Sequence, residues 1–244
     1  MKVALISDIH ANLIALDAVL ADIAREKADR IICLGDVAFK GPQPHEVIER
    51  LKSIECTFVM GNTDRIILDP ELESKVQELP EMQRMVGDLW LWGASQLTPS
   101  DRDFMGTFFP LARVALDNGE TLLCFHGSPR SAEERIFPST SEEELSAALS
   151  NHTANIFAGG HTHQQILRRW NDSLFINPGT VGLPQTPPEA EKATAEYALV
   201  TIESRASSVE FRKVPFDRGE LIKIAREKKM PQIKWWLETW QASR

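Results

Sequence analysis

The chain has 244 residues, of which 43% are hydrophobic, and its formal net charge is −8. This length is enough for one large domain or two small ones, each with a buried core. The acidic balance and the lack of a lysine and arginine block argue against extended nucleic-acid binding, but they are compatible with a short phosphate-containing ligand.

The cysteines and the N-terminal sequence bear on the compartment. Cys33, Cys56 and Cys124 fall in separate apolar runs without a C-x-x-C pair, which is typical of buried thiols in a reducing compartment. The start, MKVALISD, lacks the long apolar region of a signal peptide, and no segment approaches the length of a transmembrane helix. We therefore expect a cytoplasmic protein that does not associate with membranes.

The first sixty residues alternate between strand and helix patterns. Residues 2–8, 30–36 and 56–62 are apolar runs typical of buried strands. Residues 12–27 carry apolar side chains near a 3.6-residue period, with Asn12 as a predicted N-cap, and residues 45–54 form a second predicted helix. This β-α-β-α-β order predicts a largely parallel sheet flanked by helices.

The pattern changes from about residue 64 to residue 110, where segments 71–97 and 100–109 predict a mainly helical insertion over the sheet. The second half is mostly β, with a strand at 154–160 and hairpins at 111–127, 165–179 and 196–216. Asn118-Gly119 and Asn171-Asp172 are the predicted turns of the first two hairpins. Two helices are expected at the end, the second over 232–240. The Pro-rich segment 183–193 is too short to mark a boundary, so we predict a single domain over 1–244.

Polar side chains mark the carboxyl ends of three successive predicted strands. Asp8 and His10 mark the end of the first strand, Asp36 that of the second and Asn62 that of the third. Because side chains at positions i and i+2 of a strand point to the same side, we expect Asp8 and His10 to lie together. Ligands of open α/β sheets bind at these carboxyl ends of the strands, so the four residues are candidates for one site.

The second half supplies three histidines in comparable positions, His126 in CFHGSP and the pair His161 and His163 in GGHTHQ. Taken singly, each is also explained as a turn residue or a hydrogen-bonded surface histidine. Together the seven residues form a nitrogen and oxygen ligand set without thiolate, which suits Mn, Fe, Zn, Ni or Co. Seven ligands are too many for one ion and suit two ions that share a carboxylate.

The series D-x-H, G-D, G-N-x-D, H and G-H-x-H, from Asp8 to His163, resembles that of the calcineurin-like metallophosphoesterases. The segments GDVAFKGPQP (35–44) and NPGTVG (177–182) resemble the small bacterial and archaeal phosphodiesterase branch of that family. The resemblance implies an α/β fold, a four-layer α/β/β/α sandwich of two mixed sheets. It also implies two divalent transition-metal ions, manganese first, one bound by Asp8, His10 and His163, the other by Asn62, His126 and His161, with Asp36 bridging both.

The activity that this resemblance implies is dinuclear-metal-dependent hydrolysis of a small phosphate ester, preferably a diester, by direct attack of metal-bound hydroxide. Asp36, Asn62 and His126 would be catalytic. Two alternatives remain open at this point. One is a phosphomonoesterase or protein phosphatase, and the other is a non-catalytic scaffold of the same fold, such as the retromer subunit. The natural substrate and the oligomeric state are not defined by the sequence.

The sequence departs from the family at Thr63, where many members have a histidine that assists the leaving group and the bacterial and archaeal branch often has a cysteine. A threonine hydroxyl cannot act as a general acid near neutral pH, although it can donate a hydrogen bond to a phosphate oxygen. We expect the adjacent Asp64 to be a structural cap. His45 and Lys40 are the nearest alternative proton donors in sequence, but we expect both to be exposed loop residues.

Overall fold

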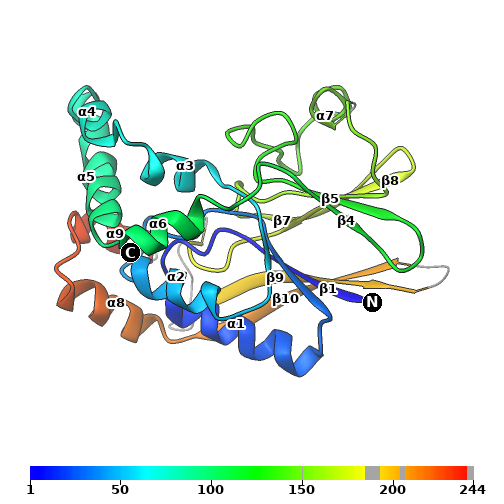
Figure 1. The fold of residues 1–244 in the computed structure, drawn as a ribbon, viewed down its shortest axis with the longest axis horizontal. Coiled ribbons are helices and arrows are strands. Elements are labelled where there is room, and N and C mark those ends of the chain that lie inside the picture. Colours follow the sequence, from blue (N-terminus) through cyan, green and yellow to red (C-terminus); the bar gives the residue numbers. More distant parts are fainter. Residues whose placement is uncertain (150, 185–192, 204–206, 241–244) are drawn as a thin grey trace.

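A computed structural model of the chain describes residues 1–149, 151–184, 193–203 and 207–240, and shows two five-stranded sheets packed face to face (Figure 1). The first sheet has the order β10-β9-β1-β2-β3, with β1 (Lys2–Ile6), β2 (Arg30–Cys33), β3 (Thr57–Phe58), β9 (Ala193–Ile202) and β10 (Ser207–Phe216). Strands β1, β2 and β3 are parallel, whereas β9 is antiparallel to both of its neighbours.

The second sheet has the order β4-β5-β6-β8-β7, with β4 (Ala112–Ala115), β5 (Thr121–Cys124), β6 (Ile156–Ala158), β7 (Gln165–Trp170) and β8 (Ser173–Pro178). Its three central strands are parallel and its two edge strands are antiparallel to their neighbours. Both sheets are therefore mixed, as the family resemblance implies.

Alternation along the strands divides the apolar side chains between two cores. Val3 and Leu5 of β1 point between the sheets, where they belong to the same cluster as Leu122 of β5. Ala4 and Ile6 point to the opposite face and pack under the helices. Because both faces of β1 are buried, its sequence is a continuous apolar run with no polar alternation.

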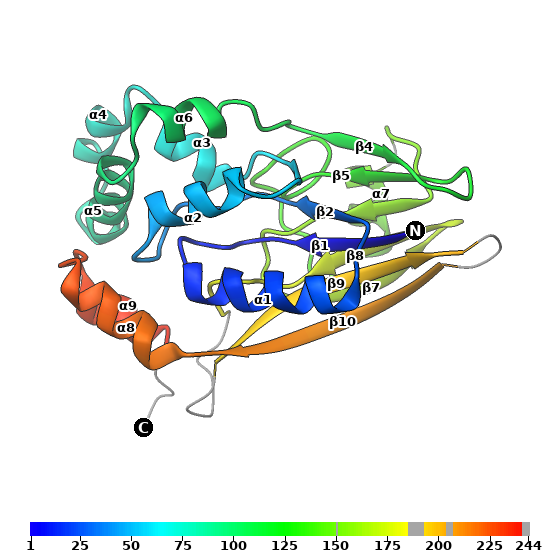
Figure 2. The same ribbon diagram turned by 60° about the horizontal axis from the view of Figure 1, so that its bottom comes forward.

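Helices cover the outer face of each sheet. Figure 2 shows α1 (Leu13–Glu26) and α2 (Pro44–Lys52) lying over the first sheet. The second sheet is covered by α7 (Glu142–Leu149), whose Leu145 and Leu149 pack on Phe157 and Phe175. Together these layers form the predicted α/β/β/α sandwich. Helix α7 lies in a region read as mostly β, and its sequence, EEELSAAL, places three glutamates in the first turn, where the helix dipole favours acidic side chains.

The predicted N-cap and the two described turns are confirmed. Asn12 Oδ1 accepts a hydrogen bond from the Ala15 amide at 3.0 Å, which caps α1. Gly119 and Asn171 have φ of +84° and +51°, the left-handed conformations expected of tight hairpin turns. The turn of the third hairpin and most of the Pro-rich segment 183–193 lie outside the described residues.

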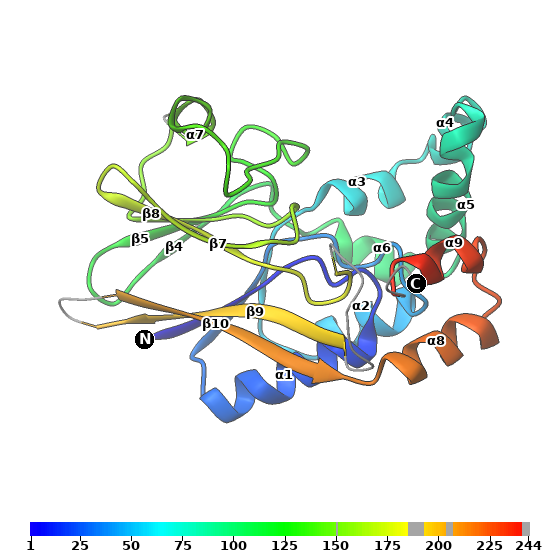
Figure 3. The same cartoon turned by 180° about the vertical axis from the view of Figure 1, so that it is seen from behind.

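The predicted insertion consists of α3 (Asn62–Leu68), α4 (Leu72–Gln77), α5 (Glu81–Ser95) and α6 (Pro99–Met105). The chain ends in α8 (Arg218–Glu227) and α9 (Ile233–Glu238), and Figure 3 shows α9 beside α5. There Trp236 and Trp240 are buried and Gln232 donates a hydrogen bond to Asp88 at 2.7 Å. The tryptophans therefore fill the core between the insertion and the last helix. Within the described ranges, no helix has both the length and the hydrophobicity needed to cross a bilayer.

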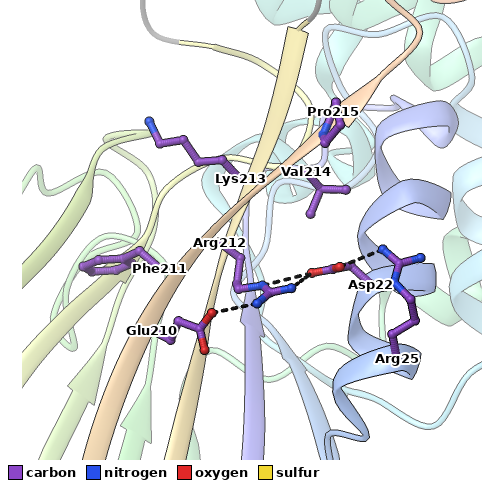
Figure 4. Close-up of a pocket in the computed structure, with 8 residues that line it drawn as sticks. All are labelled: Asp22, Arg25, Glu210, Phe211, Arg212, Lys213, Val214 and Pro215. Carbon is purple, nitrogen blue, oxygen red and sulfur yellow. Dashed lines mark hydrogen bonds and ion pairs between the residues drawn. The ribbon is translucent and has the colours of Figure 1, made fainter.

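A buried carboxylate ties α1 to the edge of the first sheet. Asp22, which is 6% exposed, accepts a hydrogen bond from Tyr197 Oη at 2.7 Å. It also accepts one from Arg212 Nη2 at 2.9 Å (Figure 4). Arg25 donates a further bond at 2.7 Å. Although burial raises the pKa of Asp22, these donors outweigh it and hold the pKa below its ordinary value.

We expect Asp22→Asn to lower the free energy of unfolding by about 1–3 kcal/mol, because it removes the buried one of the carboxylates that pair with Arg212. Since the pKa of Asp22 is lowered in the folded state, this contribution should be complete above about pH 4 and lost as the pH falls below it. Urea unfolding at neutral and acidic pH measures it. The control is Asp17→Asn, on the same helix as Asp22. It breaks the exposed ion pair of Asp17 with Arg50 of α2 and should cost less than about 1 kcal/mol.

Candidate metal centre

The seven predicted ligands meet at one end of the sandwich. Six lie on loops that directly follow β1, β2, β5 and β6, and Asn62 begins α3 after β3. One detail of the prediction is wrong. Strand β1 ends at Ile6, so strand alternation does not align Asp8 and His10. They lie in the loop beyond the strand, where both have positive φ.

Left-handed backbone recurs at these loops. Five of the predicted ligands have positive φ, namely Asp8 (+56°), His10 (+48°), Asp36 (+58°), His161 (+66°) and His163 (+57°). Residues other than glycine rarely adopt this conformation, and each instance costs on the order of 1–3 kcal/mol. Such strain concentrates at functional sites, where it turns successive side chains toward one point. The rest of the fold must stabilise these loops.

The first group contains Asp8, His10 and His163. Their ligand atoms lie within 4.8 Å of one another. The Nδ1 atom of His10 donates to the Phe39 carbonyl at 3.1 Å, so Nε2 is free to face the site. This Nε2 is 3.0 Å from Nε2 of His163, which in turn is 3.2 Å from Asp8 Oδ1. A carbonyl behind the ring and a free nitrogen in front is the arrangement typical of metal-binding histidines.

The second group contains Asp36, His126 and His161, again with ligand atoms within 4.8 Å of one another. Nδ1 of His126 donates to the Leu34 carbonyl at 2.7 Å, which directs Nε2 into the site. There Nε2 is 3.0 Å from Asn62 Oδ1 and 3.4 Å from Asp36 Oδ1. Asn62 therefore joins this group, as the sequence predicts.

Asp36 lies between the groups. Its Oδ1 faces His126, whereas its Oδ2 is 4.0 Å from Nε2 of His10 in the first group. The Thr63 amide fixes Oδ1 with a 2.9 Å hydrogen bond. A Cβ atom on Gly61 would lie 2.1 Å from this oxygen, so only glycine fits beside the carboxylate.

Burial and mutual charge set the protonation of the groups. Burial and the neighbouring His163 lower the pKa of His10 to about 3, and burial with His126 lowers the pKa of His161 to about 4. Burial also acts to lower the pKa of His126, but the Asp36 carboxylate outweighs it and raises that pKa to about 10. A cation bound at His126 would therefore displace a proton from its Nε2.

Several buried polar atoms at the site have no hydrogen-bond partner in the part of the chain that the structure describes. They include Asp8 Oδ1, His161 Nε2 and Thr63 Oγ1. An unpaired buried carboxylate oxygen or ring nitrogen is costly, and in native proteins it points to a missing ligand. The first two are aimed into the two groups, so the residues present fit divalent cations well.

Two supporting elements hold the ligand loops. Asp64 accepts hydrogen bonds at 2.9 Å from the amides of Asp36, Val37 and Gly61, which confirms its predicted structural role as a cap. Asn177, in the NPGTVG segment, donates to the Gly160 carbonyl at 2.6 Å and so braces the loop that carries His161 and His163. In the sequence, NPGTVG stands out only because it resembles a segment of the phosphodiesterase branch. Only the folded structure shows that it lies beside the loop of His161 and His163.

A third cluster of possible ligands, His45, Glu49 and Asp101, lies between α2 and α6. Lys52 already neutralises it, since its Nζ is 2.7 Å from both Asp101 and Glu49. Nδ1 of His45 donates a hydrogen bond to the Asp101 carboxylate at 2.7 Å, so His45 belongs to this network and not to the main site. The expectation of an exposed loop residue is wrong for both candidates. His45 lies in the first turn of α2 and is partly buried, and Lys40 is a loop residue that is half-buried beside Phe39.

The model of the calcineurin-like phosphoesterase superfamily domain matches residues 1–205. The chain belongs to the calcineurin-like phosphoesterase superfamily. It is accordingly a metal-dependent phosphoesterase. This agrees with the convergence of carboxylates and histidines described above, and with the two-sheet architecture.

Individual relatives are similar over most of this phosphoesterase. It is 29% identical to the uncharacterized protein MJ0912 of Methanocaldococcus jannaschii, over 75% of this chain and 77% of that protein. It is 26% identical to the phosphodiesterase YfcE of Escherichia coli, over 76% of this chain and 82% of that enzyme. The crystal structure of a metallophosphoesterase from Sphaerobacter thermophilus superposes with a TM-score of 0.75 and 25% identity, covering 98% of this chain and 99% of that one.

We expect Mn²⁺ to stabilise the chelator-treated phosphoesterase, because it would bind Asp8 Oδ1 and His161 Nε2, which have no hydrogen-bond partner in the described ranges. At about 100 times its dissociation constant the gain is about 2.7 kcal/mol, or a rise of about 5–10 °C in the unfolding midpoint. The affinity should increase from about pH 6 to pH 9, because protons compete for His126. Thermal unfolding of His161→Gln should show a much smaller rise, whereas His45→Gln should respond like the wild type. An equal response of the two variants would contradict this site.

Proposed function

We propose that the protein is a dinuclear phosphodiesterase of the cytoplasm. The observation that carries the proposal is the position of Asp36, whose two carboxylate oxygens face two separate groups of ligand atoms. A single ion would need only one such group. A carboxylate shared between two groups is the arrangement by which hydrolytic sites hold two ions about 3.5–4 Å apart.

The proposed ligands follow the two groups. One divalent cation would be held by Asp8, His10 and His163, the other by Asn62, His126 and His161, with Asp36 contributing to both. Imidazole, carboxylate and amide ligands without thiolate suit manganese first, and also Fe, Zn, Ni or Co. When bound, two such cations would acidify water and neutralise the charge of phosphoryl oxygens.

The chain's own residues have distinct parts in the proposed reaction. The backbone carbonyls of Leu34 and Phe39 orient the rings of His126 and His10, so no reorganisation is needed when substrate binds. The Thr63 hydroxyl is buried, has no partner in the described ranges and lies next to Asn62, where it can donate to a phosphate oxygen. It cannot supply a proton to the leaving group.

Different observations support the proposed diester preference and the proposed cytoplasmic location. YfcE, one of the relatives, is named as a phosphodiesterase, and a small diester with a good leaving group suits a site without a general acid at Thr63. The three cysteines are free, which agrees with a reducing compartment. The complete set of seven candidate ligands argues against a purely scaffolding role. We propose a small phosphate ester as the partner.

We expect Mn²⁺-loaded protein to hydrolyse bis(p-nitrophenyl) phosphate with a higher kcat/KM than p-nitrophenyl phosphate. Asp36→Asn should lower kcat/KM by about 100-fold or more, because it removes the charge shared by both cations. Elemental analysis should find about two ions per wild-type chain and fewer in the variant. Normal turnover by Asp36→Asn would rule out the bridging role, and preference for the monoester would favour the phosphomonoesterase alternative.

Replacing Thr63 by histidine should restore a general acid beside Asn62. We expect Thr63→His to raise kcat about 10- to 100-fold for alkyl esters, whose leaving groups need a proton, and to change p-nitrophenyl esters little. Thr63→Val removes the hydroxyl at similar volume and serves as the control, since it should not show this dependence on the leaving group. A uniform effect across all leaving groups would contradict the missing-acid explanation.

A further inference from the structure

Two cationic side chains, Lys40 and Arg135, flank the metal centre and come from opposite sheets. Lys40 is in the loop that follows Asp36, and Arg135 is in the loop that follows His126. Neither side chain has a hydrogen bond or ion pair with any residue in the described ranges. In a chain with a net charge of −8 and many carboxylates, two cations that lack a carboxylate partner beside a phosphoesterase site call for a physical explanation.

The backbone of Lys40 is anchored on three sides. Its carbonyl accepts a 2.5 Å hydrogen bond from Trp236 Nε1 of α9, and its φ is +69°. The preceding residue, Phe39, binds the ring of His10 through its carbonyl. The following residue, Gly41, is so close that a Cβ there would lie 2.0 Å from the His10 carbonyl. Lys40 is therefore held beside His10, in a left-handed conformation that costs free energy.

The ammonium group of Lys40 lies over the ring of Phe39. Its Nζ lies 5.4 Å from the centre of the Phe39 ring, within the range of a cation–π contact. Burial lowers the pKa of Lys40, while the carboxylates of Asp36 and Asp8 act in the opposite direction. The ammonium thus lies within electrostatic range of both proposed cation sites without touching a ligand.

Arg135 is anchored by its two neighbours in the sequence. Gly127, next to His126, packs so tightly that a Cβ there would lie 2.6 Å from the carbonyl of Glu134. The carbonyl of Ile136 accepts a 3.3 Å hydrogen bond from Thr162, which stands between His161 and His163. The side chain of Arg135 therefore starts between the two histidine loops, and it is exposed to solvent. The positive charge of Arg135 acts to lower the pKa of both Lys40 and His161.

We propose that Lys40 and Arg135 bind the phosphate group of the substrate, one cation from each side of the metal centre. This assignment rests on the proposed phosphoesterase function of the centre. Arg135 presents a planar guanidinium that can bind two phosphate oxygens at once, whereas the half-buried Lys40 acts as a point charge. Because both backbones are fixed to ligand loops, neither loop has to rearrange when the substrate arrives, which lowers the entropic cost of binding.

The test is the affinity for inorganic phosphate, measured by calorimetry on Mn²⁺-loaded protein and as inhibition of bis(p-nitrophenyl) phosphate hydrolysis. We expect Lys40→Met and Arg135→Gln each to weaken phosphate binding about 5- to 20-fold and to raise KM by a similar factor, with less change in kcat. The difference from the wild type should shrink at high ionic strength for the exposed Arg135. Manganese content should remain unchanged in both variants.

Matched controls exist in the same chain. Lys27 is an exposed lysine with φ of +55°, so Lys27→Met reproduces the change at a left-handed position, and Arg169→Gln reproduces the loss of an exposed arginine on β7. Both should change phosphate affinity less than 2-fold. Lys40→Arg retains the charge and should bind phosphate within about 3-fold of the wild type even if Lys40→Met folds poorly.

The outcomes distinguish a failure of the Lys40 and Arg135 assignment from a failure of the proposed function. Unchanged phosphate binding in Lys40→Met and Arg135→Gln, or equal losses in the controls, would overturn the assignment. Loss of manganese from Lys40→Met would also overturn it, since Lys40 would then support the metal site. If wild-type protein hydrolyses no ester, the proposed function fails, but calorimetry with phosphate still tests the two cations directly.

Discussion

The carboxylate of Asp64 is the interaction on which the metal centre most depends. It accepts three backbone hydrogen bonds, two from the loop after β2 and one from the loop after β3. These amides belong to the segments that carry Asp36 and Asn62. One buried acid therefore sets the distance between the loop after β2 and the start of the helical insertion. Burial and the nearby Asp36 raise the pKa of Asp64 to about 6, against the pull of the amides of Val37 and Gly61.

The same principle recurs around the centre, because several of the ligands or their loops are held by groups from another element. His126 of the second sheet binds the Leu34 carbonyl of the first, and the loop of His161 rests on Asn177 of β8. The amide of His161 also donates to Asp8 Oδ2 at 3.0 Å, which links the two sheets directly. The strained φ values of the ligand loops persist because these cross-sheet bonds hold them. A centre built in this way is preorganised for cations, as catalysis by electrostatic stabilisation requires.

The sequence predicts much of this site because its candidate ligands are polar residues at the ends of apolar runs. Asp36, Asn62 and His126 could be placed from that pattern, and the order of the motifs indicated the family. What the pattern cannot provide is geometry that depends on long-range contacts. The left-handed turns at Asp8 and His10 replace the expected strand alignment. Helix α7 was not predicted because its short, acidic sequence is stabilised by packing on β strands distant in the chain. The sequence does not single out Arg135, because its position near the site depends on contacts of its neighbours with the two histidine loops.

The hydrogen bond from Trp236 to the Lys40 carbonyl connects the last helix to a loop that begins at a proposed metal ligand. The superfamily pattern ends at residue 205, so this contact comes from sequence that the common pattern does not describe. The C-terminal segment thus supports a loop of the site, and its sequence can differ among members of the superfamily. Relatives that share every metal ligand but differ after that point would present a different surface to the same chemistry, and so accommodate different esters.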